Sequence, residues 1–169
     1  MSEITGDLDS FAVDPRLYAP LKRFSCGKGG SRAEREVNQM AREYAAGKRK
    51  CDGFRVTVER PAELAGIAAY QGVQIPRIGS LVQAYISVIG VSEDFRGRKK
   101  GSARLGDFVL MDVLGAIGVD SRWGPSPPVF ALVDPNNEPS CALFRRHGFQ
   151  VVIPAEPDNP EADSLFGRA

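Results

Sequence analysis

The segment that most constrains the fold is Leu81–Val91, LVQAYISVIGV, which is rich in β-branched and aromatic residues and carries no charge. Such a run is typical of a central strand that is covered on both faces. A basic turn follows it, and residues 102–117 are then apolar almost all round, which predicts a largely buried helix that ends near Gly118. A buried strand joined to a buried helix by a short turn favours a sheet with helices packed on its faces.

Further elements are predicted on both sides of this unit. Ser31 and Glu34 form a capping-box pattern at the start of an amphipathic stretch, which predicts a helix there. The predicted order is a helix over 31–47, strands over 54–59 (stopping before Pro61), 64–70 and 81–91, a helix over 102–117, a strand over 129–133, a helix after Asn137 and a strand over 149–153, with room for one more strand near 17–24. Three strands in a row followed by alternation predict an α/β (α+β) fold, with a mixed central β-sheet flanked by helices.

The length and the ends of the chain predict one domain with loose termini. A chain of 169 residues has the usual size of a single domain. Residues 1–15 are polar, and residues 154–169 are rich in proline and acidic residues. We therefore expect a loose N-terminus over 1–15, the folded domain over 16–153, and a mobile C-terminal tail over 154–169.

Charge and cysteine content narrow the classes of function. The 22 basic and 21 acidic residues nearly cancel, so no polyanion or membrane partner is indicated. The N-terminus lacks the pattern of a secretory signal and no apolar run is long enough to span a bilayer, so we expect a cytoplasmic protein. Cys26, Cys51 and Cys141 are too widely spaced for a zinc or redox motif, so we expect structural thiols and no metal.

The turn between the central strand and the buried helix carries the strongest chemical signal. A strand that enters a glycine-containing turn and then a helix presents free backbone N–H groups, which bind phosphate. Cationic side chains gather at the same place: Arg96, Arg98, Lys99, Lys100 and Arg104. Coenzyme A, with a pyrophosphate and a ribose phosphate, is the kind of anion that suits this density of charge. A solvated basic turn or a nucleic-acid patch would have the same composition.

Two segments together resemble the GNAT superfamily of N-acetyltransferases. Val91–Leu105 is similar to that family's strand, phosphate turn and helix, and Val133–Phe149 is similar to the strand, asparagine and short helix that close its fold. The two segments lie at the family's spacing, and the resemblance covers roughly Leu64–Ile153. It implies a GNAT-type sheet, acetyl-CoA as cosubstrate, and direct attack of an acceptor amine on the thioester.

The resemblance also implies which residues bind acetyl-CoA. The thioester and pantetheine are assigned to the strand at Ile89, Gly90 and Val91, where a glycine suits close approach of a ligand. Asn137 contacts the pantetheine arm or caps the following helix. The phosphate turn is assigned to Arg96, Gly97, Arg98, Lys99, Lys100, Gly101, Ser102 and Ala103, and Phe144 completes the predicted cofactor site.

The chain departs from the family pattern at two positions. The literal match to Arg/Gln-x-x-Gly-x-Gly/Ala starts at Arg98, but we prefer the register that starts at Arg96, in which Gly101 opens the helix and Lys99 replaces a glycine. Phe144 stands where many relatives have a tyrosine thought to protonate the leaving thiolate, and phenylalanine has no proton to give.

A general base must reach the acceptor amine directly or through water. Tyr85, predicted on the same side of the strand as Ser87, Ile89 and Val91, is one candidate, and Glu93 after the strand is the other. A core aromatic and a solvated carboxylate are the plainer readings of these residues. The expected partners are acetyl-CoA and an amine acceptor, either a small molecule or a protein, and a homodimer stays open.

Two alternative functions remain at this point. The opening Phe24-Ser-Cys-Gly27 followed by a helix resembles GNAT toxins that acetylate aminoacyl-tRNA, although near-neutral charge argues against a tRNA substrate. Phe144 and Lys99 would also suit a non-catalytic acyl-CoA-binding regulatory module. A plain nucleic-acid-binding domain is disfavoured because no recognised motif accompanies the basic turn.

Overall fold

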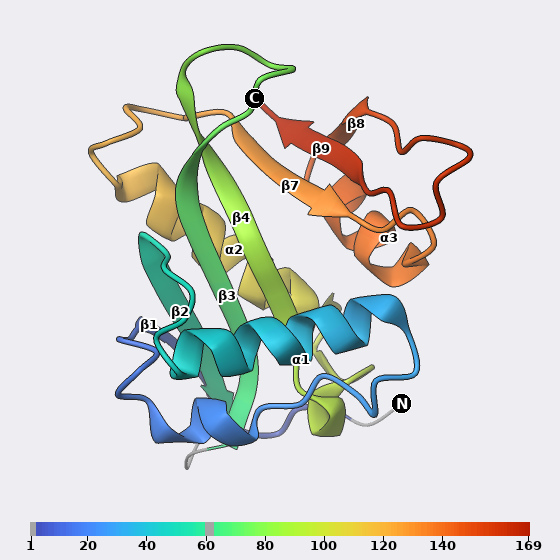
Figure 1. Ribbon diagram of the computed structural model, residues 1–169. Coiled ribbons are helices and arrows are strands. Elements are labelled where there is room, and N and C mark those ends of the chain that lie inside the picture. Colours follow the sequence, from blue (N-terminus) through green and yellow to red (C-terminus); the bar gives the residue numbers. More distant parts are fainter. Residues whose placement is uncertain (1–2, 60–62) are drawn as a thin grey trace.

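A computed structural model describes residues 3–59 and 63–169 and shows a sheet with α1 on one face and α2 and α3 on the other (Figure 1). The sheet has seven strands in the order β1-β2-β3-β4-β7-β9-β8, antiparallel except for the pair β4 and β7. Its strands are β1 Leu8–Ala12, β2 Gly53–Glu59, β3 Glu63–Gln74, β4 Val82–Val91, β7 Val129–Val133, β8 Gln150–Ile153 and β9 Ser164–Arg168. The helices are α1 Arg32–Ala45, α2 Leu105–Val119 and α3 Glu138–Arg146, with 3-10 turns η1 Ala19–Arg23 and η2 Glu93–Phe95. The predicted fold class is confirmed.

The start of α1 agrees with the prediction made from its capping pattern. The Ser31 hydroxyl accepts a hydrogen bond from the Glu34 backbone N–H, and the Glu34 carboxylate accepts one from the Ser31 N–H in return. This reciprocal pair satisfies two N–H groups that a helix start otherwise leaves without partners. The helix ends at Ala45, and Gly47 follows in the left-handed conformation with φ +68°.

The core lies in two clusters, one on each face of the sheet. Residues of α2 and α3 pack with β3, β4, β7 and β9 on one face, and residues of α1 and η1 pack with β2, β3 and β4 on the other. Leu110, Val113 and Ile117 of α2 are fully buried, as the apolar character of that segment predicts. The central strand β4 is therefore covered on both faces.

A β-bulge in β4 changes which residues share a face. Ala69 of β3 pairs with Val88, but Tyr70 pairs with Ile86, so Ser87 has no place in the regular register. The Ser87 hydroxyl meets the Tyr44 hydroxyl of α1 at 2.8 Å, whereas Ile89 and Val91 pack into the α2 cluster. The prediction that Ser87, Ile89 and Val91 share one side of the strand is wrong, because strict alternation does not survive a bulge.

Both ends of the described chain differ from the prediction of loose termini. Residues 8–12 form edge strand β1 against β2, and Ile4 is 4% exposed. Residues 164–168 form β9, which lies between β7 and β8. The segment near 17–24 forms the 3-10 turn η1 and no strand. The predicted end of a strand before Pro61 falls outside the described residues. No described helix has the length and apolarity needed to cross a membrane.

Candidate active site

A cleft opens where β4 and β7 part. The two strands pair only at Ala84↔Val129, Tyr85↔Phe130 and Ile86↔Ala131, although β4 continues to Val91 and β7 to Val133. Figure 1 shows the two ribbons diverging below this point, with α1 in front and α3 to the side. Beyond the last pair, the facing edges of β4 and β7 no longer hydrogen-bond to each other, so their backbone groups can bind another molecule.

The cleft is lined by α1, β4, β7 and α3. Most of its lining side chains are apolar, and its polar side chains come from α1, β4, the β7–α3 turn, α3 and the segment before β9. The apolar lining residues include Val37, Met40, Ile89, Val133, Leu143 and Phe144, and the polar ones are Glu36, Ser87, Asp134, Asn137, Ser140 and Asp163. An apolar cleft with a few convergent polar groups is the usual form of a small-molecule site.

Arg32 of α1 contacts three acidic residues at the cleft and so connects α1 to the opposite wall. Its guanidinium forms a close ion pair with Asp163, and its Nε lies 3.4 Å from Glu36 and 3.6 Å from Asp134. Burial raises the pKa of Asp163 and of Glu36, and Arg32 opposes the rise at both. No sequence pattern marks this cluster, because only the fold brings its residues together from three separate segments.

Asn137 caps α3, as one of its two predicted roles required. Its side-chain oxygen accepts a hydrogen bond from the Ser140 backbone N–H at 3.3 Å. The residue also lines the cleft, so a contact with a bound molecule is compatible with the cap.

Phe144 forms part of the apolar cleft wall. It is 5% exposed, lies edge-on to Phe149 at 5.0 Å between ring centroids, and packs on Phe166 at 6.1 Å. Cys141, one turn earlier on α3, is buried, and burial raises the pKa of its thiol. His147 lies at the end of α3 and pairs with Asp107, away from the residues that line the cleft.

The two candidate bases lie outside the set of residues that line the cleft. Tyr85 is half-buried where β4 still pairs with β7, opposite Phe130, and burial raises the pKa of its hydroxyl. Glu93 is exposed in η2, where its backbone N–H donates to the Ser25 carbonyl at 2.8 Å.

Gly90 has a packing role. A Cβ at this position would lie 2.7 Å from Val37 Cγ1 and 3.1 Å from Phe24 Cζ. The missing side chain therefore lets α1 and Phe24 approach β4 closely. The close approach predicted for a ligand is made in this structure by the protein's own side chains.

The basic turn forms a small hairpin before α2. Lys99–Lys100 (β5) pairs with Ala103–Arg104 (β6), and Gly101 turns between them with φ +61°. The helix begins at Leu105, so the prediction that Gly101, Ser102 and Ala103 open it is wrong. Strand pairing and the bond from the Arg104 N–H to Asp107 at 3.0 Å hold this segment out of the helix.

Most cations of the turn are paired with acidic or carbonyl oxygens. Arg96 lies 2.5 Å from Glu34, Arg98 lies 3.9 Å from Glu59, and the Lys100 ammonium donates to the Gly6 carbonyl at 3.0 Å. Arg98 also lies over the Phe95 ring at 4.8 Å. The N-terminal segment joins this network through the Ile4 N–H, which donates to the Lys99 carbonyl at 2.7 Å.

The residues present suit acetyl-CoA in two respects. The parted strands offer backbone groups for an amide-containing arm such as pantetheine. Gly97 and Gly101 have positive φ, and a Cβ at either would meet nothing within 4 Å, so their backbone is open to a ligand as large as phosphate. No described group of His, Cys, Asp or Glu side chains has an arrangement that could hold a metal ion.

Comparisons with known proteins show the fold. No family model matches the chain, and no curated protein matches it. Solved structures do: a bacterial toxin at TM-score 0.69 and 18% identity, covering 97% of this chain and 91% of the toxin. Arabidopsis thaliana Naa50 in complex with the bisubstrate analogue CoA-Ac-MVNAL matches at TM-score 0.60 and 17% identity, covering 96% and 98% of the two chains. A GNAT-family acetyltransferase from Streptococcus pneumoniae matches at TM-score 0.58 and 15% identity, covering 96% and 99%.

The mixed sheet, its parted strands and these similarities define the class: the chain has the GNAT fold. The predicted resemblance to the GNAT superfamily is thus confirmed at the level of the fold. Identities of 15–18% carry no further than that, and a fold alone does not determine an activity.

Proposed function

We propose that this protein is an acetyl-CoA-dependent N-acetyltransferase that uses the cleft between β4 and β7. The observation that carries the proposal is the early end of β4–β7 pairing at Ile86↔Ala131, on the strand that leads towards the glycine-containing basic turn. Strand backbone without a ladder partner is thus followed along the chain by an open turn backbone, and a molecule with an amide arm and a pyrophosphate needs both.

In the proposed reaction the acceptor amine attacks the carbonyl carbon of the thioester. The C–N bond forms, the C–S bond breaks, and the electron pair leaves on the coenzyme A sulfur. Backbone groups of β4 beyond the bulge position the thioester, and Asn137 contacts the pantetheine arm. The turn from Arg96 to Ala103 holds the phosphates.

The proton of the incoming ammonium needs an acceptor. Asp163 and Glu36 line the cleft, whereas Tyr85 and Glu93 do not. A carboxylate whose pKa is raised by burial is a better base than an exposed one. We therefore favour these two carboxylates, acting directly or through water, over the two candidates drawn from the sequence.

Phe144 offers no proton to the leaving thiolate. A coenzyme A thiol resembles cysteine, whose pKa of about 8.5 makes the thiolate a tolerable leaving group near neutral pH. The proposal therefore has the thiolate leave without a side-chain acid and take its proton from water.

The test is an assay for acetyl-CoA-dependent thiol release against polyamines, antibiotics, amino acids, peptides and aminoacyl-tRNA. We expect release with at least one class of amine, and no acceptor-dependent release from Gly101→Val, whose added side chain strains the turn. Asp94→Asn is the control, because Asp94 is exposed and has no interaction among the described residues. If coenzyme A binds but no amine yields thiol, the acyl-CoA-binding module replaces the enzyme.

A specific observation favours the toxin as the second candidate. A bacterial toxin is among the similar structures. The Phe24-Ser-Cys-Gly27 loop is held against α1 by the side chain of Asn38, which is 6% exposed. The Asn38 side chain accepts from the Cys26 N–H at 2.9 Å and donates to the Gly27 carbonyl at 3.0 Å. Growth arrest on expression, together with acetylated aminoacyl-tRNA, would support this candidate. Normal growth with unmodified tRNA would contradict it.

A further inference from the structure

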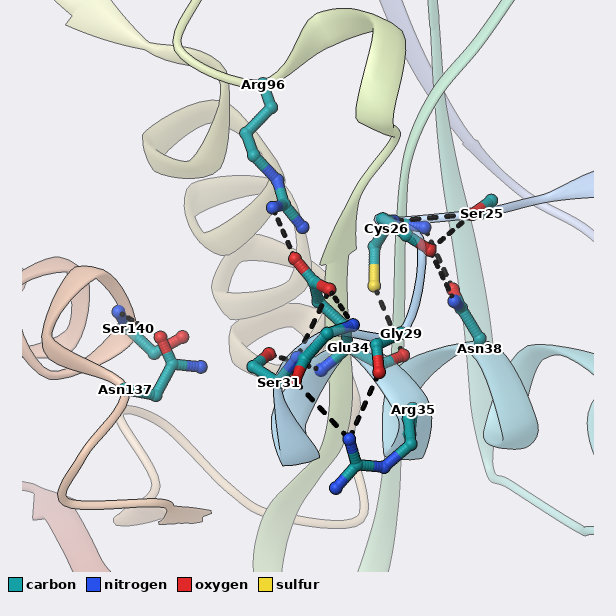
Figure 2. A network of polar contacts seen from close by, with 12 residues as sticks. Ser25, Cys26, Gly29, Ser31, Glu34, Arg35, Asn38, Arg96, Asn137 and Ser140 are labelled. Carbon is teal, nitrogen blue, oxygen red and sulfur yellow. Dashed lines mark hydrogen bonds and ion pairs between the residues drawn. The ribbon is translucent and has the colours of Figure 1, made fainter.

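We propose that Glu34 is a positioning residue that orients Arg96 for the phosphates of coenzyme A. The inference rests on the proposed function and deepens it, because it assigns to a helix-capping residue a part in binding the cosubstrate. Figure 2 shows Arg96 reaching from the turn after β4 to the first turn of α1, with Asn137 and Ser140 to the left of that turn.

The Glu34 carboxylate divides its two oxygens between two tasks. Oε2 accepts hydrogen bonds from the N–H groups of Gly30 at 2.9 Å and Ser31 at 3.4 Å, which are capping contacts. Oε1 accepts from Arg96 Nη1 at 2.5 Å. The Arg96 bond and the two backbone bonds lower the pKa of Glu34, so the carboxylate is ionised at neutral pH.

Arg96 is held at one nitrogen and is open elsewhere. The Glu34 side chain is 18% exposed, whereas that of Arg96 is 52% exposed. A guanidinium has five donors in a rigid planar arrangement, so fixing one edge also fixes the direction of the others. The remaining donors suit an anion with several oxygens, and coenzyme A brings such an anion to this turn.

The surrounding loop is shaped around this pair. A Cβ at Gly27 would lie 2.5 Å from Glu34 Cδ and 2.8 Å from Arg96 Nη2, so only glycine leaves room for the contact. Two further hydrogen bonds hold the loop: the Asn38 side chain donates to the Gly27 carbonyl, and the Glu93 N–H donates to the Ser25 carbonyl. Hydrogen bonds therefore join the segment before α1 to the chain that follows β4, and the Glu34–Arg96 contact is one of them.

A capping role alone would not explain the contact between Glu34 and Arg96. Two substitutions separate the capping role of Glu34 from its role in orienting Arg96. Glu34→Gln keeps an acceptor that can complete a capping box but removes the charge that holds Arg96. Ser31→Ala removes the hydroxyl of the cap and leaves the Glu34–Arg96 pair in place.

The experiment is calorimetric titration of coenzyme A into the full chain and its variants at low ionic strength. We expect Glu34→Gln to weaken binding about tenfold, which is about 1.4 kcal/mol, and Ser31→Ala to leave the affinity unchanged. In an Arg96→Ala background, Glu34→Gln should have no further effect, because its role is exercised through Arg96.

Equal losses from Glu34→Gln with and without Arg96 would overturn the inference, since they would mean that Glu34 acts on the fold alone. An unchanged affinity in Glu34→Gln would overturn it as well. A wild-type chain that binds no coenzyme A would overturn the proposed function together with the inference. If wild type binds coenzyme A and Glu34→Gln binds it equally well, only the inference is overturned.

Discussion

Asp107 joins the start of α2 to the end of α3, and its removal should loosen both helices. Oδ1 accepts from Arg146 Nη2 at 2.8 Å and from His147 Nε2 at 2.9 Å, and Oδ2 accepts from the Arg104 backbone N–H at 3.0 Å. The Asp107 side chain is 15% exposed, while Arg146 is 40% exposed. The contact with Arg146 is therefore partly screened by solvent, and the cap and the His147 bond are better protected.

We expect Asp107→Asn to lower the free energy of unfolding by about 2 kcal/mol. Roughly 1 kcal/mol comes from weakening the helix cap. A further 1 kcal/mol or so comes from the loss of charge in the bonds to His147 and Arg146, discounted for exposure. For a domain of this size the melting temperature should fall by about 4–8 °C.

The effect should depend on pH in a defined direction. Burial raises the pKa of Asp107, but the bonds from Arg146, His147 and the Arg104 N–H outweigh it and leave the pKa below its usual value. A carboxylate with a lowered pKa in the folded state stabilises the protein above its unfolded pKa, and this contribution is lost as the pH falls through the folded pKa. The gap between wild type and Asp107→Asn should therefore close in acid.

The assay is urea denaturation at a series of pH values, with Asp94→Asn as the matched control, which removes an exposed carboxylate that has no partner within residues 3–59 and 63–169. The control should stay within about 0.5 kcal/mol of wild type. An equally small change in Asp107→Asn at pH 7 would refute the reasoning, and so would a gap that persists unchanged at low pH.

Three further substitutions test other parts of the account. Asn137→Ala should cost about 1 kcal/mol by uncapping α3, and an unchanged denaturation midpoint would contradict that role. Gly90→Ala should cost about 1–3 kcal/mol, because its methyl group meets Val37 and Phe24, and Val37→Ala should restore much of the loss if the clash is the cause. Phe144→Tyr should change kcat less than about tenfold, because the thiolate leaves unaided. A larger gain in steady-state kinetics would show that the natural chain lacks an acid it needs.

Elements governed by local patterns were predictable from the sequence. The capping box of α1, the strand β7 and the cap of α3 each depend on neighbouring residues, and each lies where the pattern placed it. The sheet order beyond β4 depended on the resemblance, because no local signal says which strands become neighbours. β9 is an example of a strand whose neighbours no local pattern predicts. Its five residues pair with β7, and Ser164 lies opposite Val133, which is far away along the chain.

Within the site, the parts that escaped prediction depend on register and on long-range charge. The bulge at Ser87 changes the face of every later residue in β4, and the sequence carries no mark of it. The hairpin at Gly101 competes with a good helix start and prevails because the helix begins only at Leu105, where the Asp107 side chain accepts from the Arg104 N–H. The partner of Arg96 could not be inferred either, since Glu34 is already accounted for as a helix cap.

Calorimetric titration of acetyl-CoA into the wild-type chain tests the central claim, that the cleft and turn bind this cosubstrate. We predict a saturable binding heat with one site and a Kd of about 1 μM, which is about −8 kcal/mol, together with a rise in melting temperature. No heat and no thermal shift at millimolar acetyl-CoA would contradict the claim.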